Sequence, residues 1–141
     1  MTVPVVDRRL QIVAAVSAIY DALVGLLMLL GRPLLVQLFS VPPPEPPIHA
    51  DLNGVFVLSI AAGYLIPYRE PDSFGGRAYM WVMGPALKGA GALAFIADYL
   101  LRDSPPSFLL FAASDGALAL LTLWALVQKP GHRFASNTGH G

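Results

Sequence analysis

Four long apolar stretches limit what this 141-residue chain can fold into more than any other feature of its sequence. They cover residues 10–30, 52–68, 78–101 and 107–128. An α-helix needs about 20 such residues, with about 17 as the lower limit, to cross roughly 30 Å of hydrocarbon. Backbone groups in lipid must bond to each other, so these stretches must span as helices. The sequence therefore predicts an all-α integral membrane four-helix bundle, formed by a single transmembrane domain over residues 1–129.

Helix-breaking residues separate the four stretches. Gly31 and Pro33 follow the first stretch, the pair Gly75-Gly76 precedes the third, and the pair Pro105-Pro106 precedes the fourth. Glycine and proline end helices because one lacks conformational restriction and the other lacks a backbone donor. Four separate helices are therefore expected, followed by a polar, flexible C-terminal tail over residues 130–141.

The only long predicted connection is the Pro-rich outer loop, residues 31–50. Its first part, residues 34–39, is apolar enough to lie at the membrane interface, and residues 42–47 are expected to adopt extended polyproline geometry. Such a loop serves either as a stiff spacer or as a lid or docking element on the outer face.

Basic residues at the helix ends predict the orientation in the membrane. One side of the bundle carries Arg8, Arg9, Arg69, Arg77, Lys129 and Arg133, and the other carries Arg32 and Arg102. Because short cytoplasmic segments carry the excess of lysine and arginine, both termini are predicted to lie in the cytoplasm.

Three charged residues lie near the middle of predicted spans: Asp21, Lys88 and Asp115. Counted from the basic residues that flank their helices, they lie roughly 18, 17 and 21 Å into the membrane at the helical rise. A charge at the bilayer centre costs about 2.5–3.5 kcal/mol on insertion scales, so three solitary charges would strain their helices. We therefore expect the three side chains to meet inside the bundle, with Lys88 between the two aspartates.

Small residues surround these charges, which allows helices to approach closely. Ala14, Ser17 and Gly25 share the face of Asp21, and glycines and alanines flank Lys88. Pro85 is expected to kink the third helix one turn before the lysine. Two acids and one base leave one negative charge unbalanced, so either an aspartate carries a proton or a cation or positively charged ligand enters. The three residues are thus a candidate proton or ligand site, or a polar clamp between helices.

A secondary polar group lies at the start of the second helix: His49, Asp51 and Asn53. An acid in a first turn suits the helix dipole, so Asp51 is expected to cap this helix. Asp98 and Arg102, spaced i,i+4, are expected to form a solvated pair at the end of the third helix.

Several classes of function are excluded or disfavoured. The nine basic and nine acidic residues give no basic face for nucleic acid. Cysteine is absent, and the three histidines His49, His132 and His140 lie outside the spans, so no haem or metal ligand set is recognised and the cofactor stays unknown. Catalysis would rest on Asp21, Lys88 and Asp115 alone, which favours a protein that is not an enzyme.

Three short segments resemble the small four-helix bacterial inner-membrane proteins of DoxX-like topology, most of which have no assigned activity. They are Tyr20-Asp21, Leu52-Asn53-Gly54-Val55-Phe56 and Gly84-Pro85-Ala86-Leu87-Lys88-Gly89. The resemblance covers topology and length over residues 8–129. It implies a prokaryotic inner membrane and an accessory role, and it implies no catalytic residue.

The sequence favours a non-catalytic accessory or structural subunit that packs in the lipid bilayer against a partner membrane protein or further copies of itself. The alternatives are a small proton-coupled transporter, or a protein that binds a lipid, quinone or pigment, using Asp21, Lys88 and Asp115.

Overall fold

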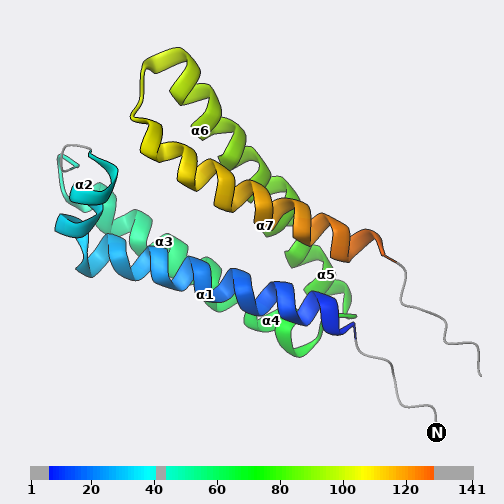
Figure 1. Ribbon diagram of the computed structural model, residues 1–141. Helices are drawn as coiled ribbons and strands as arrows, with labels where there is room; N and C mark the ends of the chain where they lie inside the picture. Colours follow the sequence, from blue (N-terminus) through cyan, green and yellow to red (C-terminus); the bar gives the residue numbers. More distant parts are fainter. Residues whose placement is uncertain (1–6, 41–43, 129–141) are drawn as a thin grey trace, which may run out of the picture.

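The computed structural model describes residues 7–40 and 44–128, and all regular secondary structure in these ranges is helical (Figure 1). The elements are α1 (Arg8–Leu30), α2 (Arg32–Phe39), α3 (Ile48–Gly63), α4 (Leu65–Arg69), α5 (Phe74–Trp81), the π-helix η1 (Val82–Lys88), α6 (Gly89–Arg102), the 3₁₀-helix η2 (Pro106–Phe108) and α7 (Leu109–Val127). Predictions for Pro42, Pro43, Lys129, His132, Arg133, His140 and the tail 130–141 lie outside the described residues.

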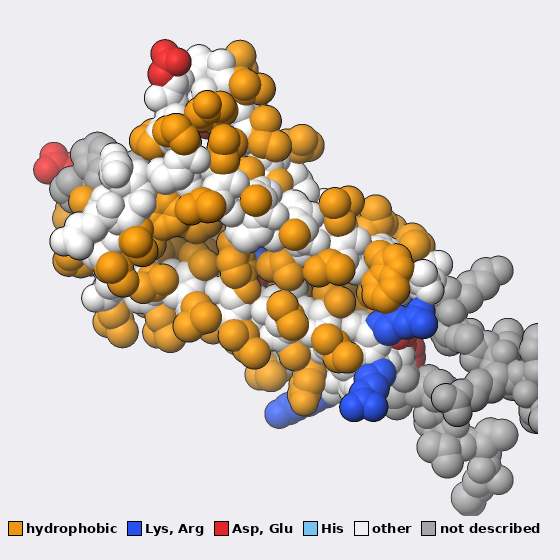
Figure 2. Space-filling view, in the orientation of Figure 1, with side chains coloured by type: hydrophobic (Ala, Val, Ile, Leu, Met, Phe, Trp, Pro, Cys, Tyr) orange, Lys and Arg blue, Asp and Glu red, His pale blue; other side chains and the backbone are white. Residues whose placement is uncertain are grey.

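Four continuous helical segments are long and apolar enough to cross a membrane: Arg8–Leu30, Ile48–Arg69, Phe74–Arg102 and Pro106–Val127. Apolar side chains cover most of the face seen in Figure 2, and Lys and Arg gather at the end next to the grey termini. This exterior suits a hydrocarbon solvent, and it confirms the predicted all-α bundle with four candidate membrane spans.

Local hydrogen bonds explain where the second and third spans begin. The carbonyl groups of Pro46 and Pro47 accept from the backbone of His49, Ala50 and Asp51, so α3 begins at Ile48 and not at Leu52. The side chain of Ser73 accepts from the Gly76 amide at 2.9 Å, which caps α5 and starts the third span at Phe74 and not at Ala78.

The outer loop contains a helix in its first part, where the sequence predicted only an apolar segment at the interface. Residues 32–39 form the short helix α2, which begins with Pro33 in its first turn, where the missing amide costs nothing. Polyproline geometry is wrong for Pro47, whose backbone is helical (φ −56°, ψ −26°), because its carbonyl takes part in the first turn of α3.

The third span contains a π-helical turn in place of a simple kink. Pro85 lies within η1, where it has no amide to donate and its ring would clash with a carbonyl four residues back. The wider turn relieves both problems and ends at Lys88. The sequence correctly predicted that the third helix is irregular at Pro85, but it did not predict that the irregularity is a π-helical turn.

The helices pack as two pairs, α1 with α3 and α6 with α7. The α1 face around Asp21 is buried as predicted, and at the α1–α3 crossing a Cβ on Gly25 would lie 3.0 Å from the Gly54 carbonyl oxygen. The two pairs meet near the start of α1 and diverge toward α2 (Figure 1).

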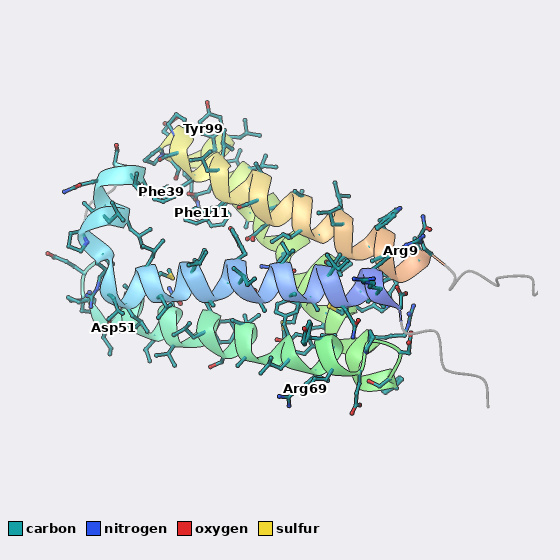
Figure 3. The ribbon with its side chains drawn as sticks, turned by 60° about the horizontal axis from the view of Figure 1, so that its bottom comes forward. Arg9, Phe39, Asp51, Arg69, Tyr99 and Phe111 are labelled. Atoms are coloured by element: carbon teal, nitrogen blue, oxygen red, sulfur yellow. The ribbon has the colours of Figure 1, made fainter. Side chains whose placement is uncertain are left out.

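The end where the pairs meet is filled by a buried core cluster: Leu10, Val13, Ala14, Tyr64, Met80, Ala125 and Leu126. Polar contacts tie the same end, since Arg9 donates to the Gln128 side chain at 2.7 Å and Arg77 to the Leu126 carbonyl at 2.8 Å. Figure 3 shows Arg9 and Arg69 at this end and Asp51 at the other. The bundle is therefore closed at the Arg9 end and open toward α2.

Replacing Gly84 with alanine should destabilise the bundle. A Cβ at Gly84 would overlap the buried side chain of Thr122, whose own Cβ lies 2.7 Å away. The crowding should lower the free energy of unfolding by about 1–3 kcal/mol, measured by circular dichroism in mixed micelles. The matched control is Gly75→Ala, where nothing lies within 4 Å, and equal losses for the two variants would contradict the close η1–α7 contact.

Candidate functional site

The centre of the bundle holds an ionic cluster made by three helical segments, which we call the charged layer (Asp21, Lys88 and Asp115). The Lys88 Nζ lies 2.5 Å from Asp21 Oδ1 and 3.5 Å from Asp115 Oδ1. Asp21 and Lys88 are only 5% and 6% exposed. The predicted meeting of the three side chains, with the lysine between two acids, is confirmed.

Neighbouring elements position each member of the charged layer. Asp21 lies on the buried face of α1, and Lys88 is the last residue of η1. Because a π-helical turn inserts one residue into the helical register, η1 rotates α6 relative to its position in an uninterrupted helix. Asp115 comes from the first half of α7, opposite Gly91 of α6.

Tyr20 and Ser114 complete the polar centre and were not among the predicted site residues. Their hydroxyl groups form a hydrogen bond of 2.7 Å between α1 and α7, and the Lys88 Nζ lies 4.9 Å from the centre of the Tyr20 ring. A cation over an aromatic face is an attractive contact. The signal that could have found them is a hydroxyl residue directly before each intramembrane aspartate.

Three buried polar atoms near the charged layer make no hydrogen bond to any described residue: Ser17 Oγ, Asp21 Oδ2 and Tyr64 Oη. Ser17 lies one turn from Asp21 on the same face of α1, and both side chains are buried. Buried oxygens of this kind normally have a partner, because leaving them without one costs about 1–3 kcal/mol each. Asp21 Oδ2 can therefore accept a hydrogen bond in addition to the contact that Asp21 Oδ1 makes with Lys88.

A cavity of about 800 Å³ opens between the two helix pairs and reaches the charged layer. Its deep end is lined by Tyr20, Asp21, Lys88 and Asp115. Its walls are mainly apolar and come from all four spans: Val24, Met28, Phe56, Val57, Ile60, Met83, Leu87 and Phe111 are among the lining residues. Ligand cavities in proteins usually measure about 300–1,000 Å³ and combine apolar walls with a few polar groups, as here.

An aromatic cluster (Phe39, Phe95, Phe108 and Phe111) lines the cavity between α2 and the α6–α7 pair. Phe39 of α2 stacks on Phe111 of α7 with ring centres 4.5 Å apart, and Figure 3 shows both side chains between these helices. The Ser107 hydroxyl also donates to the Phe39 carbonyl at 2.7 Å. The contacts hold α2 across the open side of the bundle.

The secondary polar group is divided by the structure. His49 and Asn53 line the cavity near α2, whereas Asp51 forms an ion pair of 2.6 Å with Arg32. The expectation that Asp51 caps α3 is wrong: it lies in the first turn, but the N-cap is Pro47 and no side chain caps this helix, because the Asp51 carboxylate is turned to Arg32. This arginine partner could not be read from the sequence. None of the three reaches the charged layer by an ion pair or hydrogen bond among the described residues.

The expected pair of Asp98 and Arg102 is present, with a contact of 3.1 Å at the end of α6, and Ser104 also donates to Asp98. Within residues 7–40 and 44–128, no group of three or more histidine and acidic side chains is arranged to hold a metal ion.

Comparison with protein-family models, curated proteins and solved structures gives no match to this chain.

Replacing Lys88 with methionine should destabilise the protein strongly, because two acids would then face each other without a cation. Breaking a buried ion pair costs about 3–5 kcal/mol, and neutralising all members can recover much of that loss. We expect Lys88→Met to lower the unfolding free energy by about this amount in mixed micelles, and the triple variant Asp21→Asn, Lys88→Met, Asp115→Asn to be more stable than Lys88→Met alone.

The matched control is Arg102→Met, which breaks an exposed ion pair on α6 and should leave stability unchanged. If the losses of the three single neutralising variants simply added up in the triple variant, the charged layer would not act as one interacting unit.

Proposed function

We propose that this protein binds a small amphiphilic molecule within the membrane. The observation that carries the proposal is the cavity of about 800 Å³, whose walls are mainly apolar and whose deep end is the charged layer. An apolar chain or ring system would lie along the walls, and a polar head would reach Asp21, Lys88 and Asp115. A polar clamp alone would not require this space beside it.

The closed end of the bundle favours binding over transport. The core cluster lies between the charged layer and the Arg9 end, because Leu10, Val13 and Ala14 precede Asp21 in α1. In the antiparallel α7, Ala125 and Leu126 follow Asp115 toward the same end. A carrier would have to separate these packed side chains in every cycle, whereas a binding protein can keep them closed.

The proposed orientation has both termini in the cytoplasm. Among the described residues, Arg8, Arg9, Arg69 and Arg77 lie at the closed end, and Arg32 and Arg102 lie at the open end. By the positive-inside rule, the cavity then opens toward the opposite side of the membrane. The resemblance to small bacterial proteins supports a prokaryotic inner membrane.

Filling the cavity should abolish binding without unfolding the protein. Val57 of α3 lines the cavity, and Val55, two residues away, is 53% exposed on the lipid-facing side. We expect Val57→Trp to lose at least about tenfold in affinity for a fluorescent alkyl-chain probe in uncharged detergent, and Val55→Trp to bind as the wild type does. Native mass spectrometry should show the same difference in retained apolar molecules.

Equal binding by Val57→Trp and the wild type would reject the cavity as the binding site. Circular dichroism melting of the two tryptophan variants checks that a loss of binding does not reflect a loss of fold.

A second candidate function, an accessory subunit, is favoured by a separate observation on α6 and the end of η1. Ala86, Ala90, Ala94 and Ala97 are exposed and recur at i+3 and i+4 spacing. Small residues in such a row let a second transmembrane helix approach closely. The partner would be another membrane protein or a second copy of this chain.

Replacing Ala90 with phenylalanine should prevent a second helix from packing on the four exposed alanines, because the large side chain blocks close approach. In mild detergent, light scattering should detect an associated species for the wild type and a monomer for Ala90→Phe. Leu120→Phe is the control, because Leu120 is equally exposed, at 69%, but lies on a different helix, α7. A wild type that is always monomeric and purifies alone would contradict the accessory role.

A further inference from the structure

The charges that face the deep end of the cavity do not balance. Two carboxylates, from α1 and α7, face one ammonium group from η1, which leaves a formal charge of −1. The residues that line the cavity from α3 include one histidine, His49, near α2, and no acid or lysine. Arg32 of α2 is paired with Asp51 at 2.6 Å. No described basic side chain other than Lys88 therefore reaches the layer.

The atoms left available at the deep end are acceptors. Lys88 directs its ammonium group toward both aspartates and the Tyr20 ring. Asp21 Oδ2, on a residue that is 95% buried and lines the cavity, has no hydrogen-bond partner among the described residues. A ligand head in this position would thus meet carboxylate oxygens and few free donors.

A glycine leaves room for that head next to Asp115. A Cβ on Gly91 would lie 3.6 Å from Asp115 Oδ2, and both residues line the cavity. The Asp115 side chain is 19% exposed, against 6% for the Asp21 side chain, so it is the more accessible of the two carboxylates. The space in front of its Oδ2 is therefore part of the cavity.

We infer that the ligand carries a cationic amine head on an apolar chain or ring system. This inference rests on the proposed function and names the ligand class. A monocation between Asp21 and Asp115 would bring the layer to zero charge and supply donors to its free oxygens. An anionic head would face two carboxylates, and a neutral hydroxyl head would leave the negative charge unbalanced.

Three probes with the same chain test the head group: dodecylamine, 1-dodecanol and laurate. Each is titrated as a competitor of the fluorescent probe against the full-length wild type in uncharged detergent, with Val57→Trp as the background. Because hydrogen bonds to a charged group are about twice as strong as neutral ones, the amine should bind at least about tenfold tighter than the alcohol. Laurate should bind most weakly.

The variant Asp115→Asn removes one negative charge at constant shape. It should reduce the amine-to-alcohol affinity ratio by about tenfold, and circular dichroism melting checks that the variant is folded. The matched control is Asp98→Asn, which neutralises an acid at the end of α6 that lies outside the cavity lining and should keep the wild-type ratio.

Laurate binding as tightly as the amine, or a wild-type ratio near one, overturns the assignment of an amine head but leaves the cavity as a binding site. An unchanged ratio in Asp115→Asn also overturns it. No specific binding of any of the three probes or of the fluorescent probe would reject the proposed function itself. The wild-type ratio is measured without any substitution, so the test does not depend on a variant that folds.

Discussion

The ammonium group of Lys88 is buried within an otherwise apolar candidate membrane span, and the other features of the bundle depend on how this charge is neutralised. A charge there is costly unless opposite charges meet it, so α1 and α7 must each bring an aspartate to the same depth. The contacts of 2.5 and 3.5 Å show that they do. This requirement ties three of the four spans together at one level.

Close approach of the backbones makes those contacts possible. Gly84 has no Cβ, which leaves room for the Thr122 side chain where η1 packs on α7. Gly25 and Gly54 likewise allow the backbones of α1 and α3 to come into contact. The π-helical turn around Pro85 belongs to the same arrangement, because it ends at Lys88. Small residues and one irregular turn thus act together to place a single charged side chain.

The two ends of the bundle differ, and the difference creates the cavity. At the Arg9 end the core cluster fills the space between the helix pairs. Toward α2 the pairs diverge, and the space between them becomes a cavity bordered by the aromatic cluster. A packed base keeps the geometry of the charged layer while the open half leaves room for a molecule, which is the arrangement expected of a preorganised binding site.

The order of residues along the chain was sufficient to predict the number of spans, their helical character and the meeting of Asp21, Lys88 and Asp115. These follow from properties of single residues in lipid, where backbone groups must pair and a lone charge is costly. The three-dimensional arrangement was needed to show that the helix pairs diverge, that a cavity reaches the charged layer, and that Tyr20, Ser114 and Gly91 border the layer. The ion pair between Arg32 and Asp51 also became visible only in the three-dimensional arrangement. Such features depend on the angles between helices and on which side chains face each other across a gap, and local patterns of hydropathy carry no information about either.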